Sequence, residues 1–304
     1  MSVLTVQNIV KDYGAVKALN DVTFTVPQGS VFGILGPNGS GKTTLLGIVM
    51  DVLNATSGTY SWNGHASSAE QRKKIGTLLE TPNFYSYLSG QKNLEIAAAI
   101  KGCDVNDIER VLKIVSLYER RHSGFSTYSL GMKQRLAIAS TLLGNPTTLV
   151  FDEPTNGLDP AGIAEIRELI KQLNREGKTI IMASHILDEV EKVCTHVAIL
   201  QKGILKTSGS VNEVLQTDLH QNETLVILES ADINNLVKVI TKMPGYIQHE
   251  AEDGYLKMYC DATVSTADIN KYCFENGIVL SSLGVKKKNL ETRFLEITGS
   301  IGEY

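Results

Sequence analysis

The spacing of hydrophobic residues changes several times along the chain and divides it into regions of different structure. Four short segments are apolar at consecutive positions: residues 30–35, 148–153, 179–185 and 196–201. Such runs are typical of parallel strands that are covered on both faces. Between them the apolar residues recur at helical spacing, from Pro160 to Glu176 and from Leu187 to Cys194. This alternation predicts an α/β core with a parallel sheet.

Two further regions depart from this alternation. Near the N-terminus, Val3–Ile9 and Ala18–Val26 alternate as strands around a turn, which predicts a small antiparallel β subdomain. Residues 86–146 are predominantly helical, and Ser89 is placed to cap the first helix. A connection of about 55 residues between two strands is long for a compact domain, so we expect this helical insert to be functional.

The last part of the chain has a different order of elements. From residue 219 the pattern reads strand-helix-strand-strand-helix-strand, with a final helix at Leu290–Thr298, and predicts a ferredoxin-like fold. We therefore expect one domain of residues 1–218 and a small α+β domain of residues 219–304. The three lysines at 286–288 are too few for a basic tract and are expected in a solvated loop.

Composition narrows the class of protein. Of 304 residues, 20% are charged and 42% hydrophobic, as in globular proteins. The net charge of −4 argues against a nucleic-acid or anionic-membrane binder. We find no apolar run of about 18 residues that could span a bilayer, and the N-terminus lacks the basic segment of a signal peptide. The four cysteines are scattered, which predicts reduced thiols in the cytoplasm.

The segment Gly36–Thr44 fits the phosphate-binding pattern of Gly, four residues, then Gly-Lys-Ser/Thr. It follows a predicted strand and precedes a predicted helix, so that backbone N–H groups form an anion-binding nest. Lys42 is expected to reach the β- and γ-phosphates, and Thr43 to place its hydroxyl on Mg²⁺. The alternative is a glycine-rich turn without a ligand. The predicted phosphate-binding residues are Gly36, Asn38, Gly39, Ser40, Gly41, Lys42, Thr43 and Thr44.

Three polar residues end predicted strands, at the sheet edge where parallel sheets bind ligands. Asp152 can hold Mg²⁺, and Glu153 faces another way and can orient or deprotonate the attacking water. His185 can hydrogen-bond a γ-phosphate and that water; alone it would be read as structural. Tyr13 can stack on adenine, or it is an ordinary tyrosine at the end of a strand.

Together these residues resemble the nucleotide-binding subunit of ABC transporters over residues 2–215. Gly36–Thr44 is similar to the Walker A motif of that family, and Leu149–Glu153 to Walker B with its catalytic glutamate. Asn156–Asp159 resembles the D-loop, and Asp159 is therefore counted among the nucleotide-binding residues. Tyr13 and His185 match the adenine-stacking aromatic and the switch histidine. The resemblance implies a RecA-like core with ATP and Mg²⁺ as ligands.

The resemblance also implies a role for the helical insert. The segment from Tyr128 to Arg135 occupies the signature-motif position, which in this family contacts the γ-phosphate bound to a second copy of the chain. Ser129 and Gly131 are retained, and a serine at a helix N-terminus is a suitable anion contact. The usual Leu-Ser-Gly-Gly-Gln is Tyr-Ser-Leu-Gly-Met here, so the role of the glutamine does not carry over to Met132.

A second departure lies where the insert begins. The family usually has a glutamine there, the Q-loop, and the aligned residue is Glu80. Glutamate keeps an oxygen for Mg²⁺ or water and adds a negative charge. It resembles the E-loop of lantibiotic-immunity and bacitracin-type exporters. The alternative is an alignment shifted by one or two residues, although no glutamine lies between Gln71 and Gln91.

The leading prediction is an ATP-hydrolysing subunit of an exporter that forms a homodimer and binds a separate membrane permease on its cytoplasmic face. Glu80 and Met132 favour efflux of, or self-immunity to, a peptide antibiotic. The family docks the permease near Glu80, Pro82 and Tyr85–Leu88. One alternative is a soluble ABC ATPase that acts on ribosomes or DNA; another is an inactive scaffold, which the retained Walker residues disfavour. The permease selects the substrate, so this chain does not reveal it.

Overall fold

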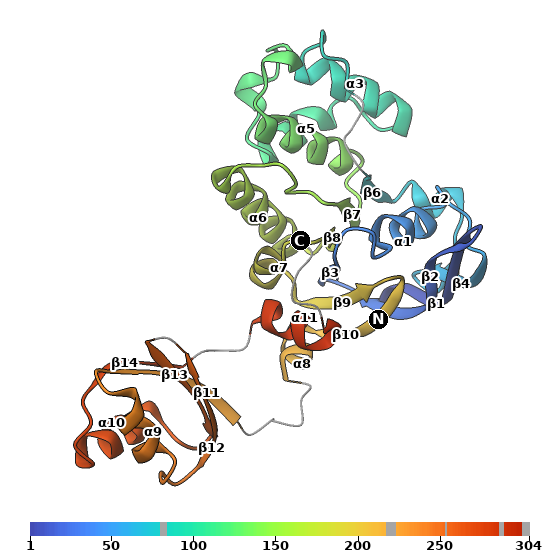
Figure 1. The fold of residues 1–304 in the computed structure, drawn as a ribbon. Helices are drawn as coiled ribbons and strands as arrows, with labels where there is room; N and C mark the ends of the chain where they lie inside the picture. Colours follow the sequence, from blue (N-terminus) through green and yellow to red (C-terminus); the bar gives the residue numbers. More distant parts are fainter. Residues whose placement is uncertain (80–83, 217–222, 253, 286–288, 300–304) are drawn as a thin grey trace. The chain divides into compact units, whose positions relative to one another are not determined.

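The computed structural model describes residues 1–79, 84–216, 223–252, 254–285 and 289–299 (Figure 1). The chain forms two compact units: the first contains Met1–Val214 and the segment that begins at Leu290, and the second contains Leu215–Asn289. Among the described residues, no helix is both long and apolar enough to cross a membrane. The four cysteines are all free thiols.

A six-stranded sheet forms the core of the first unit, in the order β10-β9-β3-β8-β7-β6. Its strands are β3 (Val31–Leu35), β6 (Ile75–Leu78), β7 (Thr148–Asp152), β8 (Thr179–Ser184), β9 (His196–Gln201) and β10 (Ile204–Ser210). All neighbours are parallel except β9 and β10. Leu35 pairs with Ser184, and Asp152 pairs with Ala183. This register brings the carboxyl ends of β3, β7 and β8 to one edge of the sheet.

An antiparallel sheet lies beside this core, in the order β2-β1-β4-β5. It comprises β1 (Ser2–Tyr13), β2 (Val16–Pro27), β4 (Ser57–Trp62) and β5 (His65–Ala66). Helix α1 (Lys42–Val49) shares a hydrophobic cluster with both sheets, and the indole of Trp62 donates a hydrogen bond to Val49 O at 2.9 Å. Apolar packing therefore holds the helix that follows the phosphate-binding segment from two sides.

The helical insert contains α3 (Gly90–Lys101), α4 (Asp107–Ile114) and α5 (Leu130–Leu142), and it stands beyond the β6–β7 edge of the core sheet (Figure 1). Ser89 caps α3 by accepting a hydrogen bond from Lys92 N, and Gly102 ends it in a left-handed conformation. Both features follow from the sequence. Outside the insert, the described α-helices that precede the second unit are α2 (Ala69–Arg72), α6 (Pro160–Arg175), α7 (Leu187–Val193) and α8 (Val211–Gln216), besides α1.

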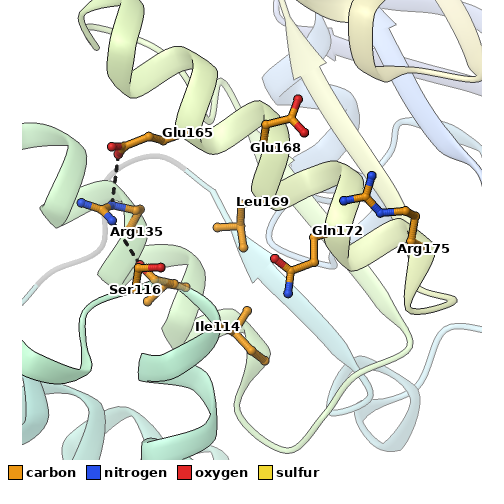
Figure 2. A pocket seen from close by; sticks show the side chains of 9 residues that line it. Ile114, Ser116, Arg135, Glu165, Glu168, Leu169, Gln172 and Arg175 are labelled. Atoms are coloured by element: carbon orange, nitrogen blue, oxygen red, sulfur yellow. Dashed lines mark hydrogen bonds and ion pairs between the residues drawn. The ribbon is translucent and has the colours of Figure 1, made fainter.

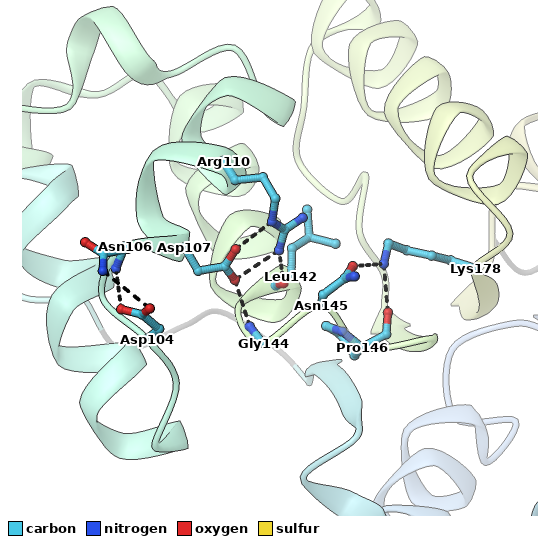
Figure 3. Close-up of polar contacts among 9 residues, drawn as sticks. All are labelled: Asp104, Asn106, Asp107, Arg110, Leu142, Gly144, Asn145, Pro146 and Lys178. Carbon is cyan, nitrogen blue, oxygen red and sulfur yellow. Dashed lines mark hydrogen bonds and ion pairs between the residues drawn. The ribbon is translucent and has the colours of Figure 1, made fainter.

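A polar network fixes the point where the insert rejoins the core (Figure 3). The Arg110 guanidinium donates to both carboxylate oxygens of Asp107 and to Leu142 O, and Gly144 N donates to Asp107 at 2.9 Å. The Arg110 hydrogen bond lowers the pKa of Asp107. On the core side, buried Lys178 donates to Asn145 Oδ1 and Pro146 O, and burial lowers its pKa.

The second unit has its own hydrophobic core. Its elements are β11 (Glu223–Ser230), α9 (Ile233–Ile240), β12 (Tyr246–Glu252), β13 (Tyr255–Asp261), α10 (Thr266–Glu275) and β14 (Leu280–Val285). The strands form an antiparallel sheet in the order β12-β13-β11-β14. Both the order of elements and the reordering of strands are those of a ferredoxin-like arrangement. The predicted loop at 286–288 lies outside the described residues.

The structure divides the chain differently from the sequence prediction at its last helix. We expected α11 (Leu290–Thr298) in the C-terminal domain, but it groups with the first unit. Leu290 is fully buried and Phe294 nearly so, and Leu290 N donates to Glu191 Oε2 at 2.7 Å. Burial of two such side chains stabilises the docked helix by about 3–6 kcal/mol. The sequence pattern predicts the helix but not the surface that covers its apolar face.

Candidate nucleotide-binding site

The phosphate-binding segment joins β3 to α1 and depends on glycines at two close approaches. A β-carbon on Gly36 would lie 2.3 Å from Leu200 O and 2.4 Å from Ser40 Oγ. A β-carbon on Gly41 would lie 2.6 Å from Ala18 O, and its φ of 103° disfavours other residues. Helix α1 starts at Lys42, because Gly41 already turns the chain into the helix.

The side chains of this segment fit an anionic phosphate ligand. Lys42 is 5% exposed, and its Nζ donates to Gly36 O at 2.8 Å and Pro37 O at 3.2 Å. The ammonium is therefore folded back over the loop. In the described part of the chain, buried Ser40 Oγ has no hydrogen-bond partner. Asn38, Gly39 and Thr43 are exposed, and Thr44 is half-buried.

The phosphate-binding segment is also held by the turn between β9 and β10. Gly203, between β9 and β10, donates its N–H to Ser40 O at 3.0 Å. A β-carbon on Gly203 would lie 2.6 Å from Ala18 O, and its φ is 76°. The Lys202-Gly203 dipeptide signals a turn, but only the register of β9 beside β3 shows that it meets the phosphate-binding segment.

Glu153 lies between the other two predicted catalytic residues, Lys42 and His185. Its Oε1 lies 3.5 Å from Lys42 Nζ, and its Oε2 lies 2.8 Å from His185 Nδ1. Side-chain exposure of 20% for Glu153 and 32% for His185 leaves both accessible to water. A carboxylate between an ammonium and an imidazole can accept a proton from a water molecule, and the other ring nitrogen of His185 remains for a second contact.

The geometry of Glu153 differs from the expected strand alternation. Strand β7 ends at Asp152, which is 6% exposed, and Glu153 begins a turn with a φ of 47°. A left-handed conformation costs a non-glycine residue on the order of 1–3 kcal/mol and requires compensation by its surroundings. The hydrogen bond from Glu153 N to Ala183 O at 3.1 Å and the two side-chain partners provide it.

Tyr13 ends β1 and is 47% exposed. The ammonium of Lys11 lies 4.9 Å from its ring centroid. The Tyr13 side chain is partly exposed, with Lys11 over its ring, and its stacking on adenine stays a prediction.

Glu80 falls outside the described residues, so its contact with Mg²⁺ and its E-loop role stay predictions.

The predicted signature and D-loop segments contact each other. Ser129 Oγ caps α5 by accepting from Met132 N at 3.2 Å, and Asp159 caps α6 by accepting from Gly162 N at 2.9 Å. Leu130 is 54% exposed, and a β-carbon on Gly157 would lie 3.6 Å from its Cδ2. Within the described residues, the side chains of Ser129 and Asp159 make their hydrogen bonds inside their own helices.

A second contact joins these helices about two turns further on (Figure 2). Arg135 of α5 lies 3.5 Å from Glu165 of α6 and donates to Val115 O at 3.3 Å. A cavity of about 350 Å³ lies there, lined by Ile114, Val115, Ser116, Arg135, Glu165, Glu168, Leu169, Gln172 and Arg175. Because α5 begins after Ser129 and α6 after Asp159, this contact helps to set the angle between the two segments.

The described residues contain no group of three or more His, Cys, Asp or Glu side chains that could hold a metal. Mg²⁺ does not require one, because it keeps several waters and binds one or two protein oxygens together with substrate phosphates. The hydroxyl of Thr43 and the carboxylate of Asp152 fit this chemistry. Mg²⁺ bound there would neutralise charge on the phosphates.

The phosphate-binding segment, the strand-end carboxylates and the inserted helices define a P-loop ATPase with a helical subdomain. The family model "ABC transporter" matches residues 19–156. The chain belongs to the ABC transporter family, as an ATP-binding protein that hydrolyses ATP.

Three relatives illustrate this family. The bacitracin transport ATP-binding protein BcrA of Enterococcus faecalis is 34% identical over 99% of this chain and 97% of its own. The lantibiotic transport ATP-binding protein SrtF of Streptococcus pyogenes is 38% identical over 73% of this chain and 97% of its own. The dimeric, post-hydrolysis structure of the ATP-binding cassette MJ0796 with ADP and Pi is 25% identical, with a TM-score of 0.60, over 68% of this chain and 98% of that one.

Proposed function

We propose that this chain is the ATPase subunit of an exporter that removes a peptide antibiotic or gives self-immunity to one. The bridging position of Glu153, 3.5 Å from Lys42 Nζ and 2.8 Å from His185 Nδ1, carries the assignment of the hydrolytic site. The names of BcrA and SrtF, which include bacitracin and lantibiotic transport, support the substrate class.

In the proposed site, the residues of the phosphate-binding segment and Tyr13 hold ATP, and Thr43, Asp152 and Glu80 would hold the Mg²⁺. Glu153 takes the proton of the attacking water. His185 keeps the Glu153 carboxylate in place through Nδ1 and offers its second ring nitrogen to the γ-phosphate or the water. The Lys42 ammonium stabilises the charge that develops on the phosphate.

The proposed assembly is a homodimer with two ATP molecules between the subunits. Among the described residues, the side chains of Ser129 and Asp159 make no hydrogen bond or ion pair with Lys42, Glu153 or His185, and space beside Gly131 is open. They are therefore available to a phosphate bound by the second copy. The dimeric cassette MJ0796 with ADP and Pi supports this arrangement.

The proposed permease contact lies where the helical insert begins, on the cytoplasmic face of the membrane. Tyr87 is 77% exposed and Tyr85 is 48% exposed, and their rings are in edge contact. Buried Asn93 holds this segment by accepting from Tyr85 N at 2.7 Å and donating to Tyr85 O. An exposed aromatic pair on a fixed backbone is suited to binding an apolar segment of a partner.

Glu153→Gln tests the hydrolytic site. The amide keeps the shape of the side chain but cannot accept a proton, so we expect kcat to fall about 10²–10⁴-fold, with ATP binding retained and an ATP-dependent dimer accumulating. Steady-state ATPase assays and size-exclusion chromatography with ATP measure both. Glu176→Gln, at the solvent-exposed end of α6, is the control. A normal hydrolysis rate in Glu153→Gln would show that another group is the base.

The transport proposal is tested separately, in a host sensitive to bacitracin and lantibiotics. Expression of this chain together with a candidate membrane permease should raise the inhibitory concentration of one of these peptides, and the Glu153→Gln version should not. Unchanged sensitivity to both peptides, with active ATPase, would reject the substrate class while leaving the hydrolytic site intact.

A further inference from the structure

The last helix of the chain packs beside the helix that follows the proposed catalytic histidine. Helix α11 (Leu290–Thr298) returns to the first unit after the second unit is complete. Its neighbour α7 (Leu187–Val193) begins two residues after His185. In Figure 1, α11 lies near α8, and it also contacts α7.

Hydrogen bonds between described residues anchor α11 along its length. Glu191 Oε2, on the last turn of α7, accepts the N–H of Leu290 at 2.7 Å. The guanidinium of Arg293, which is 8% exposed, donates from Nε to Val214 O at 3.0 Å. Gln201 Nε2 donates to Thr298 O at 3.0 Å. A carboxylate at a helix N-terminus also interacts favourably with the helix dipole, so Glu191 satisfies α11 in two ways.

The opposite sides of α7 are fixed by the core. A β-carbon on Gly33 of β3 would lie 2.8 Å from Val190 Cγ1, so the helix lies directly on that strand. Arg167 of α6 and Glu189 of α7 form a largely buried ion pair at 3.2 Å. Helix α11 is thus the third support of α7, after β3 and α6, and it is the one formed by the end of the chain.

We propose that α11 is a positioning element for His185, with Glu191 and Arg293 acting as positioning residues through α7. The inference rests on the proposed catalytic role of His185. A shift of α7 moves the segment that leads into it, and with it the His185 imidazole that lies 2.8 Å from Glu153. The phosphate-binding segment is held instead by β3, α1 and Gly203. Loss of the α11 contact should therefore reduce turnover without weakening ATP binding.

The test compares Glu191→Ala with Glu191→Gln in the full chain, by steady-state hydrolysis of MgATP. The alanine variant lacks the acceptor for Leu290 N, and small misplacement of a catalytic group is costly, so we expect kcat to fall about tenfold with KM changed less than about twofold. The glutamine variant keeps an acceptor oxygen and should stay within about twofold of the parent in both constants. Asp188→Asn is the control, because Asp188 lies on the same helix in an exposed pair with Lys192.

A second background separates positioning from general destabilisation. In a His185→Ala chain, Glu191→Ala should cause no further loss of kcat, because its effect passes through His185. A further tenfold loss there, or equal effects of Glu191→Ala and Glu191→Gln, would overturn the inference. If His185→Ala alone leaves kcat unchanged, the proposed role of His185 fails; if it lowers kcat and Glu191→Ala does not, only the role of α11 fails.

Arg293 provides an independent route, which decides the matter if Glu191→Ala does not fold. Arg293→Ala removes the donor to Val214 O, and Arg293→Lys keeps a donor and the charge. We expect the alanine variant to lower kcat at constant KM and the lysine variant to restore most of it. Melting temperatures are measured for each variant. Equal kcat values for the two Arg293 variants and the parent would overturn the inference.

Discussion

The Lys42–Glu153–His185 cluster and the Ser129–Asp159 edge belong to the same unit but are built in opposite ways. In the cluster, each side chain contacts another one that is distant in sequence, and Lys42 is 5% exposed. At the edge, the side chains cap their own helices, and the neighbouring Leu130 is 54% exposed. The first arrangement is complete within one chain. The second leaves a surface whose proposed ligand is held by another copy.

Glycine substitutions should separate the two regions most strongly. A β-carbon on Gly36 would lie 2.3 Å from the Leu200 carbonyl oxygen, whereas one on Gly131 would meet nothing within 4 Å. Gly36→Ala must therefore distort the phosphate-binding segment, and we expect ATP affinity to fall at least about 10²-fold, which corresponds to about 2.7 kcal/mol. Gly131→Ala should leave ATP affinity unchanged and lower only kcat, because the added methyl group obstructs a phosphate of the partner.

Fluorescent-nucleotide binding to the isolated chain, together with ATPase assays, measures this contrast. Gly284→Ala in β14 is a suitable control outside both regions, since its β-carbon would also meet nothing within 4 Å and its backbone is not left-handed. If Gly131→Ala weakened nucleotide binding by a single chain as much as Gly36→Ala, the two regions would be parts of one site.

Mixing two inactive chains sharpens the comparison further. Lys42→Ala removes the phosphate-binding ammonium, and Ser129→Ala removes the proposed contact across the dimer. In a mixed dimer, one of the two sites combines the intact Lys42 of one chain with the intact Ser129 of the other. We expect a mixture of the two variants to recover up to about a quarter of the parent's ATPase rate if the sites act independently in a symmetric dimer.

Each variant alone, at the total concentration of the mixture, is the control for this experiment. Ser129→Ala also costs its helix cap about 1 kcal/mol, so Ser129→Asn, which keeps a capping side chain, is mixed in parallel. Recovery with neither Ser129 variant would contradict an ATP site shared between chains.

The sequence predicts the cluster well because its motifs are local. The spacing from Gly36 to Thr44 and the strand that ends at Asp152 are read directly from neighbouring residues. The sheet edge that unites them follows from parallel topology. The left-handed turn at Glu153 leaves no such local signal, because nothing in Asp-Glu-Pro specifies a φ of 47°.

Long-range supports were less predictable. The sequence around Gly203 predicts only a turn, yet its N–H donates to Ser40 O. The sequence around Glu191 predicts only a helix, yet its carboxylate accepts from Leu290 N. Their roles depend on which surfaces the fold brings together. The same reason explains the last helix: the sequence predicts it over Leu290–Thr298, but we expected it in the C-terminal domain, and it groups with the first unit.

The smallest expected effect concerns the polar network where the insert rejoins the core. Asp107 accepts two hydrogen bonds from Arg110 and one from Gly144, so Asp107→Asn should lower the free energy of unfolding by about 1–3 kcal/mol at neutral pH, with ATP affinity unchanged. Arg110 lowers the folded-state pKa of Asp107. The stabilisation is therefore full above the unfolded-state pKa of about 4 and is lost as the pH falls through the lower folded-state value.

Urea unfolding at neutral pH and below about pH 4 measures this difference, which should shrink on acidification. Asp104→Asn is the matched control: Asp104 lies three residues before Asp107, just ahead of α4, and asparagine keeps the oxygen that accepts from Asn106 N. We expect that control to stay within about 0.5 kcal/mol of the parent. A deficit in Asp107→Asn that grows toward acid pH would mean that the carboxylate is unfavourable in the folded chain.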